Sequence, residues 1–116
     1  MKILVKIIIL IVLLSSSNLT KVLAQDKIKL GLLVPISGEF SEIGKSIIKS
    51  TLLAINKIDD PLIEIIPKDT ASNPDVTYKN AKQLQEAGVK IVIGPVFNKN
   101  LIKLEKLSDM TFLSLT

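Results

Sequence analysis

Four short apolar runs constrain the fold of this chain more than any other feature of its sequence. They occupy residues 29–35, 62–66, 89–93 and 110–115. The runs are largely continuous, rather than alternating apolar with polar residues, which is the pattern of strands buried on both faces of a parallel sheet. Prolines close the first three, at Pro35, Pro67 and the pair Gly94-Pro95. We therefore predict four short parallel strands.

The stretches between these runs have helical periodicity. Residues 41–58 repeat apolar side chains at helical spacing, and Asp59-Asp60-Pro61 ends that stretch. Asn73-Pro74-Asp75 predicts a second helix start, because an asparagine cap, a proline in the first turn and an early acid all favour one. Gly88 fits the left-handed C-terminal cap of that helix. A shorter third helix is expected at residues 101–107, which contain four apolar side chains.

These elements alternate as β-α-β-α-β-α-β. Their connections are short, as in parallel crossovers, and strands that are apolar throughout need helices on both faces. The predicted fold class is α/β, a doubly wound parallel sheet. The fourth run has no helix after it, so we expect the chain to be the opening portion of a longer protein.

Residues 1–24 resemble a secretory signal peptide. Lys2 and Lys6 precede the apolar run 7–14, and Val22 and Ala24 place small residues at −3 and −1 of a cleavage site after Ala24. The alternative is an uncleaved membrane anchor, but eight helical residues rise only ~12 Å, whereas a span needs roughly 20 residues. We expect residues 25–116 to be released into the periplasm, with membrane contact only through the signal peptide before cleavage.

Charge and composition exclude several function classes. Three of the 15 lysines lie in the first 24 residues, which leaves 12 lysines against 11 acids and no arginine. This near-neutral balance argues against nucleic-acid binding, which needs a clustered basic face. The chain has no cysteine and no histidine, so an N-terminal lipid anchor, the common zinc and copper ligands and histidine acid–base catalysis are all excluded.

The residues that follow each predicted strand are the candidates for ligand binding. In open parallel sheets, ligands bind beyond the carboxyl ends of the strands, near the point where strand order reverses. Hydroxyl and amide groups there suit a small polar ligand, although each could instead cap a helix or close a turn. These positions are Ser37 and Gly38, Asp69 and Thr70, residues 94–98, and residues 114–116.

The motifs of common enzymes on this fold are absent from the sequence. The first turn lacks the glycine-rich dinucleotide fingerprint, and Gly44-Lys45-Ser46 lacks the earlier glycine that a phosphate-binding loop requires. No nucleophile elbow occurs, and the carboxylates are scattered. The sequence predicts no enzyme activity, no cofactor and no metal.

Three segments of the chain resemble a known family. Residues 29–38 with Gly44, residues 68–74 and residues 88–95 are similar, in order and spacing, to type I periplasmic binding proteins of the leucine-binding (branched-chain amino acid receptor) family. That family has two α/β lobes joined by a hinge, which close on a small ligand. The resemblance implies that residues 25–116 form a partial N-terminal lobe. It also implies that the ligand faces Ser37, Phe40, Phe97, Asn98, Ser114 and Thr116.

The resemblance leaves two functions open. A receptor of this family captures a small polar ligand, such as an amino acid or amide, and delivers it to the membrane subunits of an ABC importer. The short link at residues 58–61 and the run at 93–97 are instead similar to the penicillin-binding protein activators. Those proteins regulate cell-wall synthesis through contacts with a synthase, and this is the alternative function. An enzyme or nucleotide-binding protein of the same layer order is the least favoured.

Overall fold

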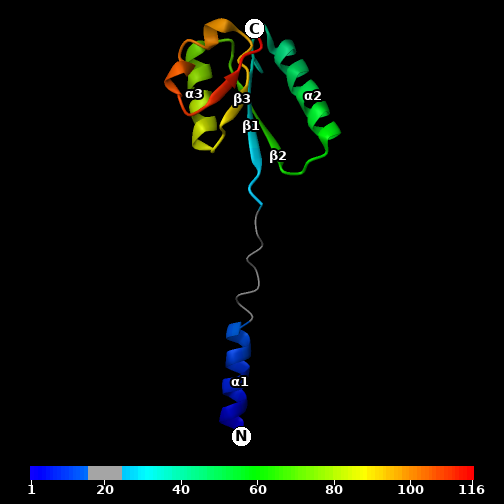
Figure 1. The fold of residues 1–116 in the computed structure, drawn as a ribbon, viewed down its shortest axis with the longest axis vertical. Coiled ribbons are helices and arrows are strands. Elements are labelled where there is room, and N and C mark those ends of the chain that lie inside the picture. Colours follow the sequence, from blue (N-terminus) through cyan, green and yellow to red (C-terminus); the bar gives the residue numbers. More distant parts are fainter. Residues whose placement is uncertain (16–24) are drawn as a thin grey trace.

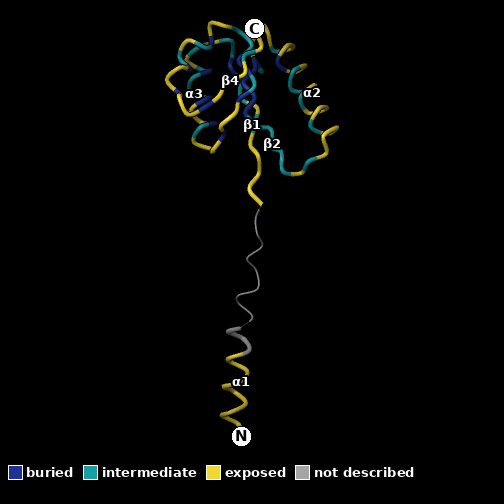
Figure 2. The backbone as a smooth tube through the Cα atoms, in the orientation of Figure 1, coloured by how far each residue is buried: buried dark blue, intermediate teal, exposed yellow. Residues whose placement is uncertain are grey.

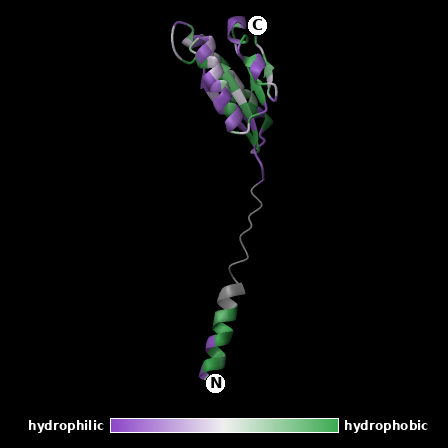
Figure 3. Cartoon of the chain, turned by 90° about the vertical axis from the view of Figure 1, so that its left-hand side faces the viewer, coloured by the Kyte–Doolittle hydropathy of each residue, from purple (hydrophilic) through white to green (hydrophobic). Residues whose placement is uncertain are grey.

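A computed structural model of the chain describes residues 1–15 and 25–116. The N-terminal helix α1 (Lys2–Ser15) is apolar apart from two lysines and its final serine (Figure 3). Its side chains are exposed from residue 2 to residue 11 (Figure 2). No helix in the described residues is both long enough and apolar enough to cross a membrane. The predicted cleavage position after Ala24 lies outside the described residues, so it stays a prediction.

Within residues 25–116 the chain forms a four-stranded parallel sheet with helices on both sides (Figure 1). The strand order is β2-β1-β3-β4, so the chain moves outward from β1 to β2 and then returns past β1 to β3. Right-handed crossovers that run in opposite directions must place their helices on opposite faces. Helix α2 accordingly covers one face and α3 the other, which confirms the predicted α/β class. The strands are β1 (Ile28–Val34), β2 (Ile63–Asp69), β3 (Ile91–Ile93) and β4 (Thr111–Leu113), and the helices are α2 (Ser41–Ile58) and α3 (Pro74–Glu86).

Strand β2 runs through Pro67, where the sequence analysis placed its end. The strand continues to Asp69, and Pro67 lies opposite Leu32 of β1. Successive strand residues direct their backbone groups to opposite sides, and Thr70 N donates to Val34 O of β1. Pro67, three residues earlier, therefore has its nitrogen toward the open edge of the sheet. An edge strand tolerates proline there because no ladder hydrogen bond is lost.

The main hydrophobic core lies between the sheet and α3 (Figure 2). Leu33 of β1 and Val92 of β3 supply the sheet side, and Ala81 and Leu84 supply the helix side; all four are fully buried. Helix α3 begins as predicted, since Asn73 Oδ1 accepts from Asp75 N at 2.8 Å and from Val76 N at 3.2 Å. Gly88 follows the helix with φ of 83°, the left-handed conformation expected of it.

The predicted third α-helix at residues 101–107 is wrong. The segment from residue 98 to residue 110 instead contains two short 3₁₀ helices, η2 (Asn98–Asn100) and η3 (Leu104–Lys106), joined by turns. Four of its apolar residues are three apart, and each is linked to the next by an i→i+3 backbone bond. A helix with three residues per turn puts all of them on one face toward the core, which an α-helix with 3.6 residues per turn would not do. These residues are Leu101, Leu104, Leu107 and Met110.

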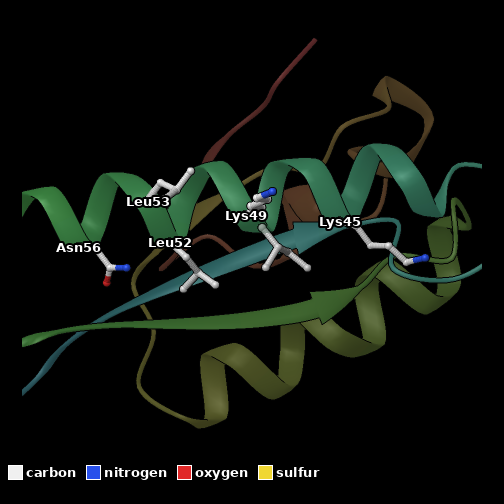
Figure 4. A pocket seen from close by; sticks show the side chains of 6 residues that line it. Lys45, Lys49, Leu52, Leu53 and Asn56 are labelled. Atoms are coloured by element: carbon white, nitrogen blue, oxygen red, sulfur yellow. The ribbon is translucent and has the colours of Figure 1, made fainter.

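Helix α2 has the predicted bounds but covers its face of the sheet less completely. Only Gly44 is fully buried in it, and Leu52 and Leu53 are 47% and 60% exposed. A shallow apolar depression of about 300 Å³ runs along this helix (Figure 4). Lysine stems and an asparagine border it. Its lining residues are Lys45, Ile48, Lys49, Leu52, Leu53 and Asn56.

Candidate functional site

The carboxyl ends of the four parallel strands bring the predicted ligand-binding loops to one edge of the sheet. Because the chain goes from β1 to β2 and back to β3, the strand order reverses between β1 and β3. Open α/β sheets bind ligands at this switch point. We call the six predicted residues at this edge the rim. They follow β1 (Ser37, Phe40), β3 (Phe97, Asn98) and β4 (Ser114, Thr116).

Two aromatic side chains meet across the switch point. The rings of Phe40 and Phe97 have centroids 5.0 Å apart at an interplanar angle of 61°, an edge-to-face contact. Phe40 precedes α2 and is 38% exposed, whereas Phe97 is half-buried. The pair therefore links the loops after β1 and β3 and leaves part of one ring accessible to a ligand.

A close approach of backbone holds the Phe40 loop against the sheet. A Cβ built on Gly44, in the first turn of α2, would lie 1.9 Å from Pro35 O at the end of β1. Only a glycine lets the helix come so near. The N-terminal end of α2, and Phe40 directly before it, are therefore positioned by this contact.

The loops after β3 and β4 are joined by hydrogen bonds. Thr116 Oγ1 donates to Asn98 Oδ1 at 2.5 Å, and the hydroxyl oxygens of Ser114 and Thr116 lie 3.1 Å apart. Leu115 N also donates to Pro95 O at 3.1 Å. Asn98 and Thr116 are exposed, and Ser114 is half-buried. The structure thus brings five of the six predicted residues into three direct contacts, Phe40 with Phe97, Asn98 with Thr116, and Ser114 with Thr116.

Ser37 contacts Asp69, which the sequence analysis placed among the candidate positions after the strands but not among the six residues implied by the family resemblance. Its hydroxyl donates to Asp69 Oδ2 at 2.5 Å, and its backbone N donates to Asp69 Oδ1 at 3.2 Å. Ile36 N and Ala71 N also donate to Asp69 Oδ1, at 2.7 and 2.8 Å. Asp69 therefore fastens the loop after β1 to the loop after β2. Its position three residues after the apolar run 62–66 was the signal in the sequence, but that position alone also fits a simple turn.

The environment of Asp69 keeps its carboxyl ionised. Partial burial raises the pKa of Asp69, but the hydrogen bonds donated by Ser37, Ala71 and Ile36 together outweigh burial and hold the pKa below its ordinary value. Asn80 Nδ2 of α3 donates to the Asp69 backbone oxygen at 2.6 Å, which fixes the residue from the other side. The carboxylate is therefore a permanent negative charge beside Ser37 at neutral pH.

The loop after β2 has an unusual backbone. Ala71 and Ser72 have φ angles of 45° and 51°, in the left-handed region that residues with a Cβ seldom adopt. Two such residues in succession cost free energy, and proteins retain this kind of strain mainly where function needs one geometry. Here the strained turn directs Ala71 N to Asp69 Oδ1. The conformation of this loop thus supports the position of the Asp69 carboxylate that accepts from Ser37.

Comparisons with known proteins give one family and a set of solved structures. The family described as "Periplasmic binding protein" matches residues 27–106. No curated protein gives a significant match to the sequence. An ABC transporter substrate-binding protein from Sphaerobacter thermophilus shares the fold, with 20% identity, a TM-score of 0.70, and coverage of 77% of this chain and 26% of that one.

Two further structures are more similar in sequence. The solute-binding protein of an ABC transporter from Rhodopseudomonas palustris BisB5, in complex with 3,4-dihydroxybenzoic acid, has 31% identity and a TM-score of 0.67 over 72% of this chain and 24% of its own. The C-domain of LpoA from Haemophilus influenzae, a regulator of PBP1A, has 27% identity and a TM-score of 0.60 over 74% of this chain and 27% of its own. The chain thus spans about a quarter of the length of these structures.

Proposed function

The chain belongs to the periplasmic binding protein family, and from this premise we propose that it forms one wall of the cleft in which an exported receptor captures a small polar ligand for an ABC importer. The family resemblance of the sequence is thereby confirmed. The proposal places the protein in the periplasm, after cleavage of residues 1–24 behind Ala24. It assigns no enzyme activity to the chain.

One observation supports this function above all others: the Phe40–Phe97 pair lies at the same edge of the sheet as the exposed hydroxyl and amide groups of the rim. An aromatic surface offers apolar contact to the body of a ligand, and polar groups around it orient the ligand. An amino acid with an apolar side chain fits this combination. A small aromatic acid also fits, in line with the ligand bound by the Rhodopseudomonas palustris protein.

The chain should bind such ligands weakly by itself, because a receptor of this family closes a second lobe over the ligand. We therefore propose a titration that detects millimolar binding, with ¹H–¹⁵N NMR spectra recorded as leucine, glutamate or 4-hydroxybenzoate is added. Shift changes should be confined to residues 36–40, 97–98 and 114–116. A Phe97→Ala variant should reduce the response, whereas Ser50→Ala, on the exposed side of α2, should leave it unchanged. Shift changes that avoid the rim for every ligand would contradict the proposal.

A second candidate function is contact with a cell-wall synthase. The similarity to the LpoA C-domain favours it, as does the exposed apolar depression on α2, where lysines border Leu52 and Leu53 (Figure 4). Exposed apolar residues with a polar border are typical of protein-binding surfaces. A Leu53→Glu variant separates the two functions, since it should weaken binding to a purified synthase and leave ligand titrations at the rim unchanged.

A further inference from the structure

The hydroxyl of Ser37 can donate only one hydrogen bond, and in the structure that bond is donated to Asp69. Ser37 Oγ donates to Asp69 Oδ2 at 2.5 Å. A serine hydroxyl is one donor with two acceptor lone pairs, so this contact leaves only acceptor capacity. Ser37 is exposed at the rim. A ligand that reaches it therefore meets a hydrogen-bond acceptor.

Other hydrogen bonds hold the Asp69 carboxylate in place, so the hydrogen bond from Ser37 is not readily lost. Three backbone N–H groups, from Ile36, Ser37 and Ala71, donate to its other oxygen, Oδ1, over 2.7–3.2 Å. Rotation of the carboxylate away from Ser37 would leave those donors without their acceptor, which costs more than an ordinary hydrogen bond contributes. The negative charge also repels any ligand carboxylate that approaches Ser37.

At the other end of the rim, Asn98 offers hydrogen-bond donors instead of an acceptor. Asn98 Oδ1 accepts the hydroxyl proton of Thr116 at 2.5 Å. The amide group of Asn98 still has two N–H donors, and no atom among the described residues accepts from them. Because Asn98 is exposed, these donors are available to a ligand acceptor such as a carboxylate oxygen. The Phe40–Phe97 contact joins the loops that carry the two ends.

We propose that Asp69 is a positioning residue that makes Ser37 an acceptor, so that the ligand presents an N–H or O–H donor to Ser37 and a carboxylate to Asn98. This inference rests on the proposed function, because it assigns the orientation of a ligand at the same rim. The ligand class is a small acid that also carries an ammonium or hydroxyl group. An acid without such a donor has no partner at Ser37 and lies near the charge of Asp69.

Matched ligand pairs test this polarity on the full chain, purified after export. The pairs are leucine with 4-methylpentanoate, which has the same carbon skeleton without the amino group, and 4-hydroxybenzoate with benzoate. NMR titration of the rim signals gives an affinity for each. One hydrogen bond to a charged or polar partner corresponds to roughly five- to tenfold in affinity. We expect the donor-bearing member of each pair to bind tighter by that factor.

Variants then assign the preference to Asp69. In Asp69→Asn the side-chain amide can donate to Ser37 Oγ, which leaves the Ser37 hydroxyl free to donate to the ligand. The preference for the donor-bearing ligand of each pair should then fall to about twofold or less. Ser37→Ala should remove the preference as well, and it is the second test if Asp69→Asn does not fold. Ser50→Ala on α2 is the matched control and should keep the wild-type preference. Amide spectra of each variant, compared with wild type, report whether the fold is intact.

The outcomes separate the inference from the proposed function. Equal affinities within both pairs, measured at the rim of the wild-type protein, would overturn the inference and leave ligand capture standing. A preference that persists in Asp69→Asn and Ser37→Ala would overturn the role of Asp69. Absence of rim binding by all four ligands would refute both the inference and the proposed function.

Discussion

Replacement of Gly44 by alanine tests whether the contact between α2 and the end of β1 positions the rim. The new Cβ would lie 1.9 Å from Pro35 O and 2.6 Å from the Pro35 carbonyl carbon. An ordinary contact needs at least 3.4 Å, so the shortfall is about 1.5 Å. Both clashing atoms belong to backbone, so no side-chain rotation relieves the overlap. The N-terminal turn of α2 must move outward.

The expected free-energy change combines two opposing effects. Overpacking of this kind typically costs about 1–3 kcal/mol, and a clash with backbone belongs near the upper end. Alanine in a helix interior is more favourable than glycine by about 1 kcal/mol. The free energy of unfolding should therefore fall by about 2 kcal/mol. Phe40, directly before α2, should also shift relative to Phe97.

Urea unfolding followed by circular dichroism at 222 nm measures the stability change, and NMR shifts of the Phe97 ring report the movement of Phe40. Ser50→Ala is the control, because Ser50 is an exposed position of the same helix. This control should gain a few tenths of a kcal/mol from helix propensity alone. A Gly44→Ala protein as stable as Ser50→Ala, with unchanged Phe97 signals, would refute the reasoning.

Two further predictions concern the loop after β2. Asn73→Ala removes the cap that accepts from Asp75 N and Val76 N, so the free energy of unfolding should fall by about 1 kcal/mol in urea titrations; an unchanged midpoint would contradict the assigned cap. The folded pKa of Asp69 is depressed, so its contribution to stability is present above its ordinary pKa of about 3.9 and is lost as pH falls through the folded value. Asp69→Asn should therefore be less stable than wild type at pH 7, and the difference in urea midpoint should shrink below about pH 4. A difference independent of pH would contradict the stabilising role of the hydrogen bonds that the Asp69 carboxylate accepts.

Much of the fold could be predicted from local patterns. The helix at residues 41–58, the Asn73 cap and the left-handed Gly88 all depend on interactions within a few residues, which a linear sequence displays directly. The same holds for the parallel strands, because continuous apolar runs with short helical connections leave few other arrangements. The grouping of the rim loops at one edge followed from the parallel strands.

Other features needed the assembled molecule. Pro67 reads as a strand end, and only its place on the open edge of β2 explains why the strand continues through it. The spacing of Leu101, Leu104 and Leu107 is compatible with either kind of helix until the core shows that all three must face it. In both cases the sequence pattern is ambiguous and the neighbouring element resolves it.

Local patterns in the amino-acid sequence define the kind of sheet, the order of its elements and the set of loops at the carboxyl edge. The tertiary structure decided which of those loop residues touch, and above all that Ser37 donates its proton to Asp69, 32 positions away. Periodicity and caps act over one or two turns of chain, so they carry no information about a partner so distant. The hydrogen bond that the Ser37 hydroxyl donates depends on a contact that exists only once β1 and β2 lie side by side.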